Sequence, residues 1–460
     1  MKHYENIYFL GIGGIGMSAL ARLFLHEGRR VAGYDRTPTP LTAALEEEGA
    51  EIHYEESVEA IPVPFRDPER TLVVYTPAVP VDHAEYLWLK EQGFQIEKRS
   101  QMLGYLSEGK YVMAVAGTHG KTTTSTLVAW LNHAACGEGS AILGGISKNF
   151  SSNLVLGQGD RLTLEADEFD RSFLRLKPNV AVVTSADADH LDIYGTHEKM
   201  KEAFSEFISL IHPGGSLILK AGVELALRNE EITCYRYAYD TPADFYARNI
   251  RLQPGGYYLF DLVLPEGELK DCTLGIPGWV NIENAIAAVA SLWCAAKERR
   301  ERFDGEAVKR ALASFQGVKR RFEFYLNTPE QVYMDDYAHH PRELSAAITS
   351  VKEMFPKRHL LALFQPHLYT RTRDLYQEFA EALSLADEVV LLPIYPAREE
   401  PIPGVNSEMI AQKITVPCSI VEREVIADYL SQRESDVVVS FGAGNIDAYC
   451  KAIAEVLSKK

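Results

Sequence analysis

The sequence Gly117-Thr118-His119-Gly120-Lys121-Thr122-Thr123 decides how this chain is interpreted. It follows an apolar run, 111–116, and precedes a run of helical character, 124–135, so the local order is strand, glycine loop, helix. Backbone N–H groups of such a loop can surround phosphate oxygens, and the helix N-terminus adds about half a positive charge. Lys121 can reach the terminal phosphates, and the Thr122 hydroxyl can ligate Mg²⁺. The loop therefore predicts an ATP site, although Val115 stands where the common longer form has its first glycine. A structural glycine turn with an incidental lysine is the less favoured alternative.

A second glycine motif lies near the N-terminus. The apolar run 7–10 leads into Gly11-Ile12-Gly13-Gly14-Ile15-Gly16 and a helical run, 17–26, and the next strand, 31–34, ends at Asp35. This order predicts a doubly wound parallel sheet that holds a diphosphate on the glycines and a ribose on the acid. Three readings stay open on the motif alone: an NAD-dependent oxidoreductase, a site for a UDP-carrying substrate, and a structural turn.

Further polar residues follow the strands after the first loop. One strand ends at Glu165, with Glu168 just beyond it, and the next leads into an Asp-rich turn that ends at His190. Ligand-binding groups collect beyond the carboxyl ends of parallel strands. A hydroxyl from Thr122, the Glu165 carboxylate and the His190 imidazole would suit a hard divalent cation if phosphates and waters fill the other positions. The alternatives are a capping carboxylate and a structural histidine.

The rest of the chain predicts more α/β structure. Residues 217–264 are rich in strand patterns, and Asn281 and Asn284 stand at the start of an alanine-rich helix, where they can cap it or present amides to a base. Apolar strands are expected at 332–334, 360–364, 389–394 and 437–441. Each ends in polar or glycine-rich residues, at 335–341, 365–367, 395–398 and 442–445.

Composition excludes several classes of protein. A length of 460 residues suggests two to four domains, and the net charge of −17 argues against binding to nucleic acid or to an anionic membrane. We expect neither a signal peptide nor a membrane span. The six cysteines form no C-x-x-C pair, which favours reduced thiols and a cytoplasmic location.

Taken together, these motifs resemble the Mur ligases of bacterial cell-wall synthesis. The resemblance rests on GIGGIGM (11–17), AGTHGKTT (116–123), EADEFDRSF (165–173), DADHLDIYG (187–195), GVKRRFE (317–323), DDYAHHP (335–341), QPHLYTRTRD (365–374) and LPIYPAREEPIPGV (392–405).

The resemblance implies an α/β protein of three domains. These are a Rossmann-like domain for the UDP-sugar (1–108), a central P-loop ATPase-type domain (109–321) and a C-terminal Rossmann-like domain for the amino acid (322–460). It implies the ATP-dependent joining of L-alanine to the lactyl carboxylate of UDP-N-acetylmuramate through an acyl phosphate, for peptidoglycan precursor synthesis. The implied partners are these three substrates with Mg²⁺ or Mn²⁺, and we expect a monomer or homodimer.

The resemblance also assigns roles to residues. Those implied to bind ATP are Gly117, Thr118, His119, Gly120, Lys121, Thr122, Thr123, Asn281, Asn284, Arg321 and Asp336. Those implied to bind the UDP-sugar are Gly11, Gly13, Gly14, Gly16, Met17, Asp35, Thr76 and Arg99. Tyr337, His339, Arg371 and Arg373 would border the alanine. Lys121, Glu165, His190, His339 and Arg371 would carry the chemistry. Thr122 and Glu165 would be ligands of one Mg²⁺, and His190 of a second.

Three positions depart from the family pattern. Val280 replaces a frequent histidine and Leu368 a frequent arginine, so one adenine contact and one anion contact are in question. Phe169-Asp170-Arg171 stands where small residues are commoner, and Arg171 could pair with an acid without a catalytic role. The nearest alternative function is the ligation of a whole tripeptide to the same sugar nucleotide. The family members that ligate the tripeptide carry a longer insertion after the EADE motif, so the resemblance, with its short spacing from Glu165 to His190, implies alanine. The 117–123 loop argues against an NAD-dependent oxidoreductase.

Overall fold

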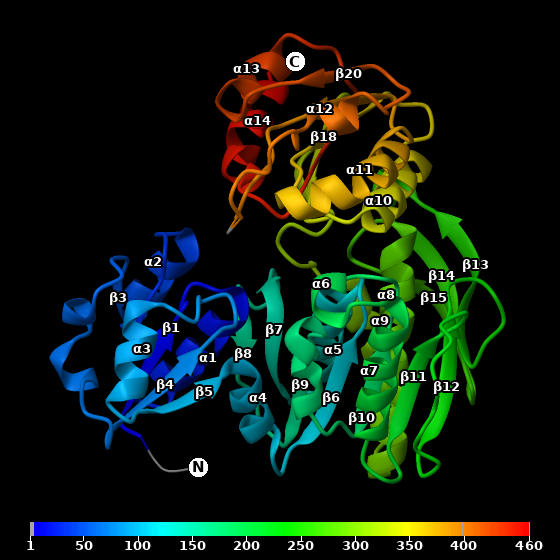
Figure 1. The fold of residues 1–460 in the computed structure, drawn as a ribbon. Coiled ribbons are helices and arrows are strands. Elements are labelled where there is room, and N and C mark those ends of the chain that lie inside the picture. The colour runs from blue at the N-terminus through cyan, green and yellow to red at the C-terminus, as the bar shows by residue number, and fades with distance from the viewer. Residues whose placement is uncertain (1–3, 398, 460) are drawn as a thin grey trace. The chain divides into compact units, whose positions relative to one another are not determined.

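The computed structural model describes residues 4–397 and 399–459, and Arg398, part of one predicted strand end, lies outside them. Within this range the chain forms three β-sheets with intervening helices, which confirms the predicted mixed α/β class (Figure 1). In the described part of the chain, no helix combines the length and apolar character needed to cross a membrane.

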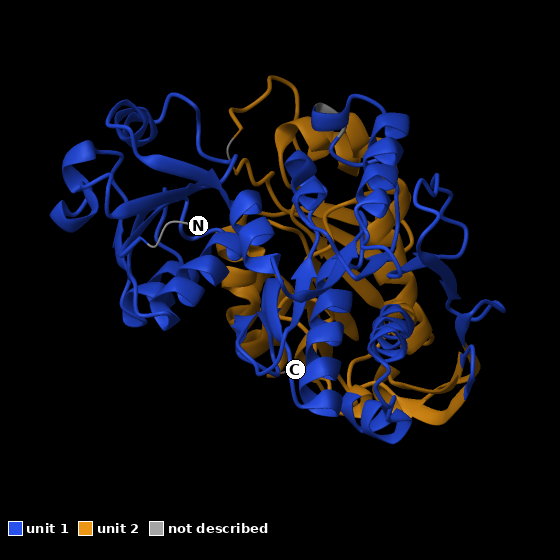
Figure 2. Cartoon of the chain, turned by 90° about the horizontal axis from the view of Figure 1, so that it is seen from below, with its two compact units in different colours: residues 1–246, 264–267, 284–311 blue, residues 247–263, 268–283, 312–460 orange. Residues whose placement is uncertain are grey.

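The chain divides into two compact units by its internal contacts (Figure 2). Unit 1 comprises residues 1–246, 264–267 and 284–311, and unit 2 comprises 247–263, 268–283 and 312–460. The expected boundaries after residues 108 and 321 remain predictions.

The first sheet, in unit 1, is parallel throughout, with the order β3-β2-β1-β4-β5. Its strands are β1 (Asn6–Leu10), β2 (Arg30–Tyr34), β3 (Glu51–His53), β4 (Thr71–Tyr75) and β5 (Gln95–Lys98). The accompanying helices are α1 (Ile15–His26), α2 (Pro40–Glu47), α3 (Ala84–Glu91) and α4 (Arg99–Ser107). β1 is buried along its whole length, as expected for a central parallel strand, and the predicted order of strand, glycine turn and helix is confirmed.

The second sheet has the order β15-β14-β13-β12-β11-β10-β6-β9-β7-β8. Its strands are β6 (Tyr111–Ala116), β7 (Ser140–Ser147), β8 (Ser152–Val155), β9 (Arg161–Glu165), β10 (Val180–Val183), β11 (Ser216–Lys220), β12 (Thr233–Ala238), β13 (Phe245–Leu252), β14 (Tyr258–Leu264) and β15 (Gly267–Thr273). Its helices are α5 (Lys121–Cys136), α6 (Leu191–Tyr194), α7 (His197–Ser209), α8 (Trp279–Arg299) and α9 (Gly305–Ala313). The strand-rich stretch 217–264 is confirmed.

Two contacts within unit 1 position the glycine motifs. Helix α5 packs on β6, β7 and β9, and α1 packs on β7 and β8 of the second sheet. Asn153 on β8 fixes the start of α1, because its Nδ2 donates to the Ile15 carbonyl at 2.6 Å and its Oδ1 accepts from Arg22 Nη1 at 2.6 Å. The glycine turn before α1 is thereby tied to the second sheet.

The third sheet, in unit 2, has the order β16-β17-β21-β18-β19-β20. Its strands are β16 (Glu323–Asn327), β17 (Val332–Asp336), β18 (Leu360–Phe364), β19 (Glu388–Leu391), β20 (Cys418–Ile420) and β21 (Val437–Phe441). Its helices are α10 (Pro341–Met354), α11 (Tyr369–Leu383), α12 (Glu408–Ala411), α13 (Ile426–Ser431) and α14 (Cys450–Leu457). All pairings are parallel except that of β16 with β17, so the ends of β17, β18 and β21 share one edge. Short 3₁₀ helices occupy Val58–Ala60, Val63–Phe65, Phe169–Arg175, Pro254–Gly256, Arg423–Val425 and Ile446–Tyr449.

Candidate functional site

The loop between β6 and α5 has the backbone that its glycines predict. Gly117 has φ 134° and Gly120 has φ 79°, conformations that residues with a side chain rarely adopt. A Cβ on Gly117 would also fall 2.1 Å from the Thr184 hydroxyl. Helix α5 begins at Lys121, three residues earlier than predicted, because the left-handed Gly120 serves as its N-cap. Lys121, Thr122 and Thr123 therefore form the first helical turn, where backbone N–H groups lack helical partners.

Two residues that sequence reasoning did not single out support this loop from the end of β10. The His119 N–H donates to Ser185 Oγ at 2.8 Å, and the Thr118 and Ser185 hydroxyls are hydrogen-bonded at 2.9 Å. The Thr184 hydroxyl donates to the His119 carbonyl. Both are small hydroxyl residues directly after a buried strand, and that position is the signal that could have identified them.

Lys121 is folded back onto the loop and onto an acidic partner. Its Nζ donates to the Gly117 carbonyl at 2.6 Å and to Glu168 Oε1 at 2.9 Å. Burial alone lowers the pKa of Lys121, but the carboxylates of Glu168, Asp167 and Glu165 outweigh it and raise the pKa above its usual value. Burial raises the pKa of Glu168, which Lys121 opposes. The lysine is thus held as a cation at the mouth of the loop.

The predicted metal ligands come from three neighbouring elements. Thr122 is buried at the start of α5, and the Glu165 carboxylate at the end of β9 accepts from Ser125 Oγ at 3.4 Å. A Cβ on Gly144 would fall 2.3–2.5 Å from the Glu165 carboxyl group, so a larger residue there would displace this carboxylate. His190, with φ 50°, has its Nε2 3.7 Å from Glu168 Oε1 and 3.7 Å from Asp189 Oδ2.

The donor set fits a hard cation completed by phosphate and water. Glu168 Oε2 is buried without a hydrogen-bond partner, and an anionic oxygen in that state favours a cation nearby. Among residues 4–397 and 399–459 no group of three His, Cys, Asp or Glu side chains is already arranged as a metal site. Mg²⁺ usually retains several waters and takes only one or two carboxylates, so such a preformed cage is not required. Glu168, rather than Glu165, is the acid that contacts both Lys121 and His190.

Asn281 and Asn284 lie in the first turns of α8, which begins at Trp279, earlier than predicted. Asn284 Oδ1 accepts from Thr124 Oγ1 at 3.2 Å, and a Cβ on Gly120 would approach the same oxygen to 2.9 Å. Asn284 therefore lies against the glycine loop. Asn281 donates to the Pro277 carbonyl at 2.6 Å, and Val280 lies beside it.

The N-terminal glycine turn brings together most of the predicted UDP-sugar residues. Asp35 Oδ2 accepts from the Gly13 N–H at 2.7 Å, and Thr76 lies so close to Gly11 that a Cβ there would be 2.7 Å from its methyl group. Arg99 Nη2 pairs with Asp167 Oδ2 at 3.0 Å. A cavity of about 190 Å³ lies here, lined by Gly14, Ile15, Gly16, Met17, Thr76, Pro77, Arg99, Ser100, Asp167, Phe169 and Ser172.

In unit 2, the end of β17 gathers several predicted residues. Asp336 accepts from the backbone N–H groups of Phe322 and Ala338, both at 2.9 Å, and burial raises its pKa to about 6. The guanidinium of Arg321 lies over the Tyr337 ring, 5.1 Å from its centroid.

His339 is held by its neighbours at the start of α10. Its Nδ1 is 3.1 Å from the Tyr337 carbonyl and 3.4 Å from Glu343 Oε2. Burial lowers the pKa of His339 to about 4, although Glu343 opposes the shift, so the imidazole is uncharged at neutral pH. Glu343 was not anticipated; its place three residues after His340 in a capping box is the signal that could have found it.

The two predicted arginines of α11 differ. Arg371 Nη1 is 3.4 Å from His367 Nδ1, and the His367 and His339 rings are 6.2 Å apart, so Arg371 is near the cluster. Arg373 is exposed and pairs with the adjacent Asp374 at 2.7 Å, so the structure does not bring it to the cluster. Leu368 is buried with φ 69° and directly precedes α11.

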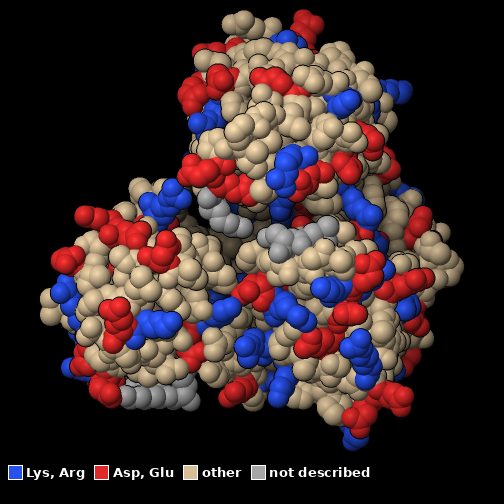
Figure 3. Space-filling model, viewed as in Figure 1, with Lys and Arg blue, Asp and Glu red and all other residues tan. Residues whose placement is uncertain are grey.

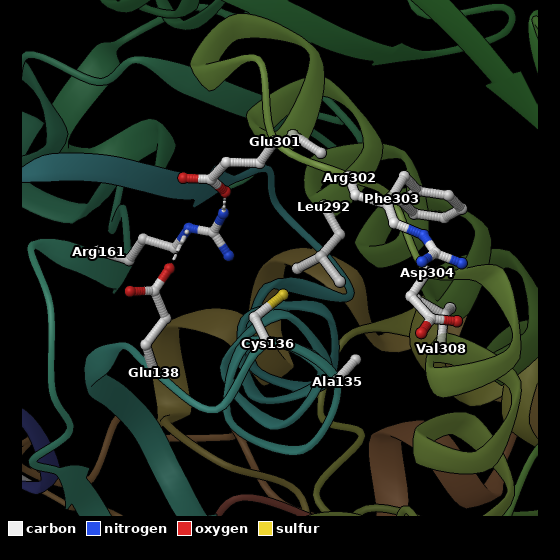
Figure 4. Close-up of a pocket in the computed structure, with 11 residues that line it drawn as sticks. Ala135, Cys136, Glu138, Arg161, Leu292, Glu301, Arg302, Phe303, Asp304 and Val308 are labelled. Atoms are coloured by element: carbon white, nitrogen blue, oxygen red, sulfur yellow. Dashed lines mark hydrogen bonds and ion pairs between the residues drawn. The ribbon is translucent and has the colours of Figure 1, made fainter.

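A larger cavity, of about 390 Å³, lies in unit 1 at the other end of α5 (Figure 4). Cys136, the last residue of α5, lines it, and Arg161 forms ion pairs there with Glu138 and Glu301. A helix of 16 residues is about 24 Å long, so this cavity is far from the glycine loop. We assign no phosphate to it. Figure 3 shows acidic and basic side chains interspersed over the face in view.

Comparisons with known proteins show which family the chain is similar to. Residues 6–111 match the model of the Mur ligase family, catalytic domain; residues 115–292 match the Mur ligase middle domain; and residues 320–444 match the Mur ligase, glutamate ligase domain. The UDP-N-acetylmuramate–L-alanine ligase of Phocaeicola vulgatus is 50% identical over 461 residues, which cover 99% of each chain. That of Parabacteroides distasonis is 49% identical, over 99% of this chain and 97% of the relative.

Solved structures are similar over the whole length. The UDP-N-acetylmuramate–alanine ligase of Thermotoga maritima matches with a TM-score of 0.82 and 28% identity, over 99% of this chain and 100% of the other. A murein peptide ligase of Psychrobacter arcticus shares the fold, with a TM-score of 0.71, 22% identity and 99% of each chain covered. Three family models match in order, and a relative that aligns with 99% of the chain is 50% identical. The chain therefore belongs to the Mur ligase family.

Proposed function

We propose that this chain uses ATP to join L-alanine to the lactyl carboxylate of UDP-N-acetylmuramate, giving UDP-N-acetylmuramoyl-L-alanine, ADP and phosphate. The observation that carries the proposal is the glycine loop with its partly buried cation: Lys121 lies at the first turn of α5, 2.9 Å from Glu168. The 50% and 49% identity to L-alanine ligases favours alanine over the tripeptide, and a dehydrogenase has no use for such a loop.

The reaction has two steps. A carboxylate is a poor electrophile, so an oxygen of the lactyl carboxylate first attacks the γ-phosphorus of ATP, and ADP leaves. The neutral amine of L-alanine then attacks the acyl carbon and loses one proton, the amide keeps the other, and phosphate leaves with the former carboxylate oxygen. The protein's main contributions are to position the reactants and to balance negative charge.

In this scheme the Lys121 ammonium group leaves Glu168 and pairs with the β- and γ-phosphates. The N–H groups of residues 117–123 surround the phosphate oxygens. Asn284 lies where it can contact the nucleotide, and Asn281, Arg321 and Asp336 are proposed to bind it as well. Thr122, Glu165 and His190 would hold Mg²⁺ or Mn²⁺, which supplies further neutralisation of the phosphates when bound.

The other two substrates are assigned to the remaining polar clusters. The diphosphate of the UDP-sugar is placed on Gly11–Met17, and Asp35 accepts from its ribose, with Thr76 and Arg99 along the cavity. Arg371 can grip the alanine carboxylate with a two-pronged guanidinium, with Tyr337 beside it. An uncharged His339 does not repel the alanine ammonium group. Arg373 is proposed only as an outer contact, because it pairs with Asp374.

The test is a phosphate-release assay with ATP, Mg²⁺ and UDP-N-acetylmuramate, run against L-alanine, glycine, L-serine and the tripeptide. We expect release to require all components, with L-alanine the best acceptor and the product mass that of the alanyl sugar nucleotide. Faster release with the tripeptide, or NAD reduction in a parallel assay, would contradict the proposal. We expect the chain to act in the cytoplasm, and its state as a monomer or homodimer remains a prediction.

A further inference from the structure

Phe169 has two neighbours that belong to different parts of the site. It lines the cavity of about 190 Å³ together with the glycine turn and Arg99. Its ring also makes an edge contact with the His190 imidazole, with centroids 5.2 Å apart and planes at 74°. One side chain thus contacts both the proposed sugar-nucleotide cavity and a proposed metal ligand.

The backbone around Phe169 holds this position. Its N–H donates to Asp167 Oδ1 at 3.1 Å, and the other oxygen of Asp167 pairs with Arg99 at 3.0 Å. The next two residues, Asp170 and Arg171, have φ of 52° and 55°, left-handed conformations that cost non-glycine residues energy. Such strain is found where the surrounding structure requires a particular side-chain placement.

Ion pairs on either side hold this strained turn. Asp170 pairs with Lys98 at 2.9 Å, and Arg171 pairs with Glu206 at 3.0 Å. Lys98 directly precedes Arg99 at the cavity, so the turn is tied to the element that supplies a cavity wall.

The His190 ring depends on packing for its orientation. The two carboxylate oxygens near its Nε2 are both 3.7 Å away, longer than a hydrogen bond. A metal-binding histidine normally has its ring oriented by a hydrogen bond from its other ring nitrogen. Here the T-shaped contact with the Phe169 ring restricts the imidazole.

We propose that Phe169 is a positioning residue that couples occupancy of the sugar-nucleotide cavity to the cation affinity of His190. A sugar nucleotide in the cavity packs against one side of the ring and restricts its motion. The restricted ring holds the imidazole in the orientation that a cation needs. By linkage, the cation must then strengthen sugar-nucleotide binding by the same factor. The inference rests on the proposed function for the identity of the ligands.

The test measures Mn²⁺ binding by the loss of the free-ion electron paramagnetic resonance signal. Protein is titrated in the presence of a non-hydrolysable ATP analogue, with and without UDP-N-acetylmuramate. We expect the sugar nucleotide to tighten Mn²⁺ binding in the wild type. Phe169→Leu and Phe169→Met should weaken Mn²⁺ binding about three- to tenfold, the size of an aromatic pair contribution, and abolish the effect of the sugar nucleotide. Phe169→Tyr, which keeps the ring, should restore both.

A matched control exists in the same unit. Phe150 makes a similar edge contact with His133, at 5.3 Å and 82°, outside the proposed site, so Phe150→Leu should behave like the wild type. The inference would be overturned if Phe169→Leu or Phe169→Met bound Mn²⁺ as tightly as the wild type. It would also be overturned if UDP-N-acetylmuramate tightened Mn²⁺ binding in these variants as much as in the wild type. If the wild type released no phosphate with all three substrates present, the proposed function would be refuted instead. Two variants are used so that a folding failure in one leaves the test intact.

Discussion

The ion pair between Lys121 and Glu168 allows stability and activity to be separated by a double-mutant cycle. The Glu168 side chain is 1% exposed and that of Lys121 14% exposed, so removal of the lysine leaves a buried carboxylate without its cation. Breaking a buried pair in this way costs about 3–5 kcal/mol. We therefore expect Lys121→Met to be strongly destabilised at pH 8, and Lys121→Met/Glu168→Gln to recover most of the loss.

The pH dependence follows from the pKa of the unpaired acid. The ordinary pKa of a glutamate is 4.5. Burial raises the pKa of Glu168 above it, and removal of Lys121 takes away the cation that opposes this shift. The folded state then holds a proton that the unfolded state releases, so stability falls as the pH rises from 4.5 towards the folded pKa. Each pKa unit corresponds to about 1.4 kcal/mol. The loss of folding stability is therefore at most about 5 kcal/mol at pH 8, and below about 1 kcal/mol at pH 5, which is close to the unfolded pKa.

Thermal melts followed by circular dichroism at pH 5 and pH 8 measure this effect. For a domain of this size, about 3–5 kcal/mol corresponds to a melting temperature lowered by roughly 10 °C. Lys309→Met, which removes an exposed pair with Glu306, is the matched control and should not shift the melt. Phosphate release should be lost in both Lys121 variants, although the double variant is stable. A Lys121→Met protein that melts like the wild type at pH 8, or that is equally destabilised at both pH values, would refute the reasoning.

Two further predictions concern Asp35, which follows β2, and Asp336, the last residue of β17. Burial raises the folded pKa of Asp336 to about 6 from 3.8, so the wild type loses stability as the pH rises from 5 to 7.5. The Asp336→Asn variant has no such group and should gain about 1.5 kcal/mol relative to the wild type over this range. Thermal melts at both pH values measure the difference in stability between the two proteins. Asp35→Ala should weaken UDP-N-acetylmuramate binding about 10- to 100-fold by calorimetry and leave ATP affinity unchanged, because a charged acceptor 2.7 Å from the Gly13 N–H is lost. Glu47→Ala on the exposed face of α2 is its control, and a loss of ATP affinity alone would count against the assignment.

Much of the fold could be predicted because continuous apolar runs followed by glycine have few alternatives. The strands at 111–116, 360–364 and 437–441 were predicted with the bounds that the structure shows. The start of α5 was not, because a helix cap depends on the left-handed backbone of Gly120 rather than on residue type alone. The antiparallel hairpin β7–β8 contains glycine and serine, which are poor strand signals, and was not anticipated.

The sequence predicts which types of residue form the site, but not which side chains contact one another. Glu165 and Glu168 are equivalent by pattern, and only the turn after β9 decides that Glu168 contacts Lys121. The Arg99–Asp167 pair joins residues 68 positions apart in the sequence, and no local periodicity encodes it. Family resemblance identified Arg371 and Arg373 together, whereas the direction of each side chain on α11 separates them.

The central claim is that an oxygen of the sugar-linked carboxylate attacks the γ-phosphorus of ATP held on the glycine loop. UDP-N-acetylmuramate labelled with ¹⁸O in both lactyl carboxylate oxygens tests it directly. With ATP, Mg²⁺ and L-alanine, mass analysis of the released phosphate should find one ¹⁸O atom in each phosphate formed. Unlabelled phosphate accompanied by alanyl product would contradict the account.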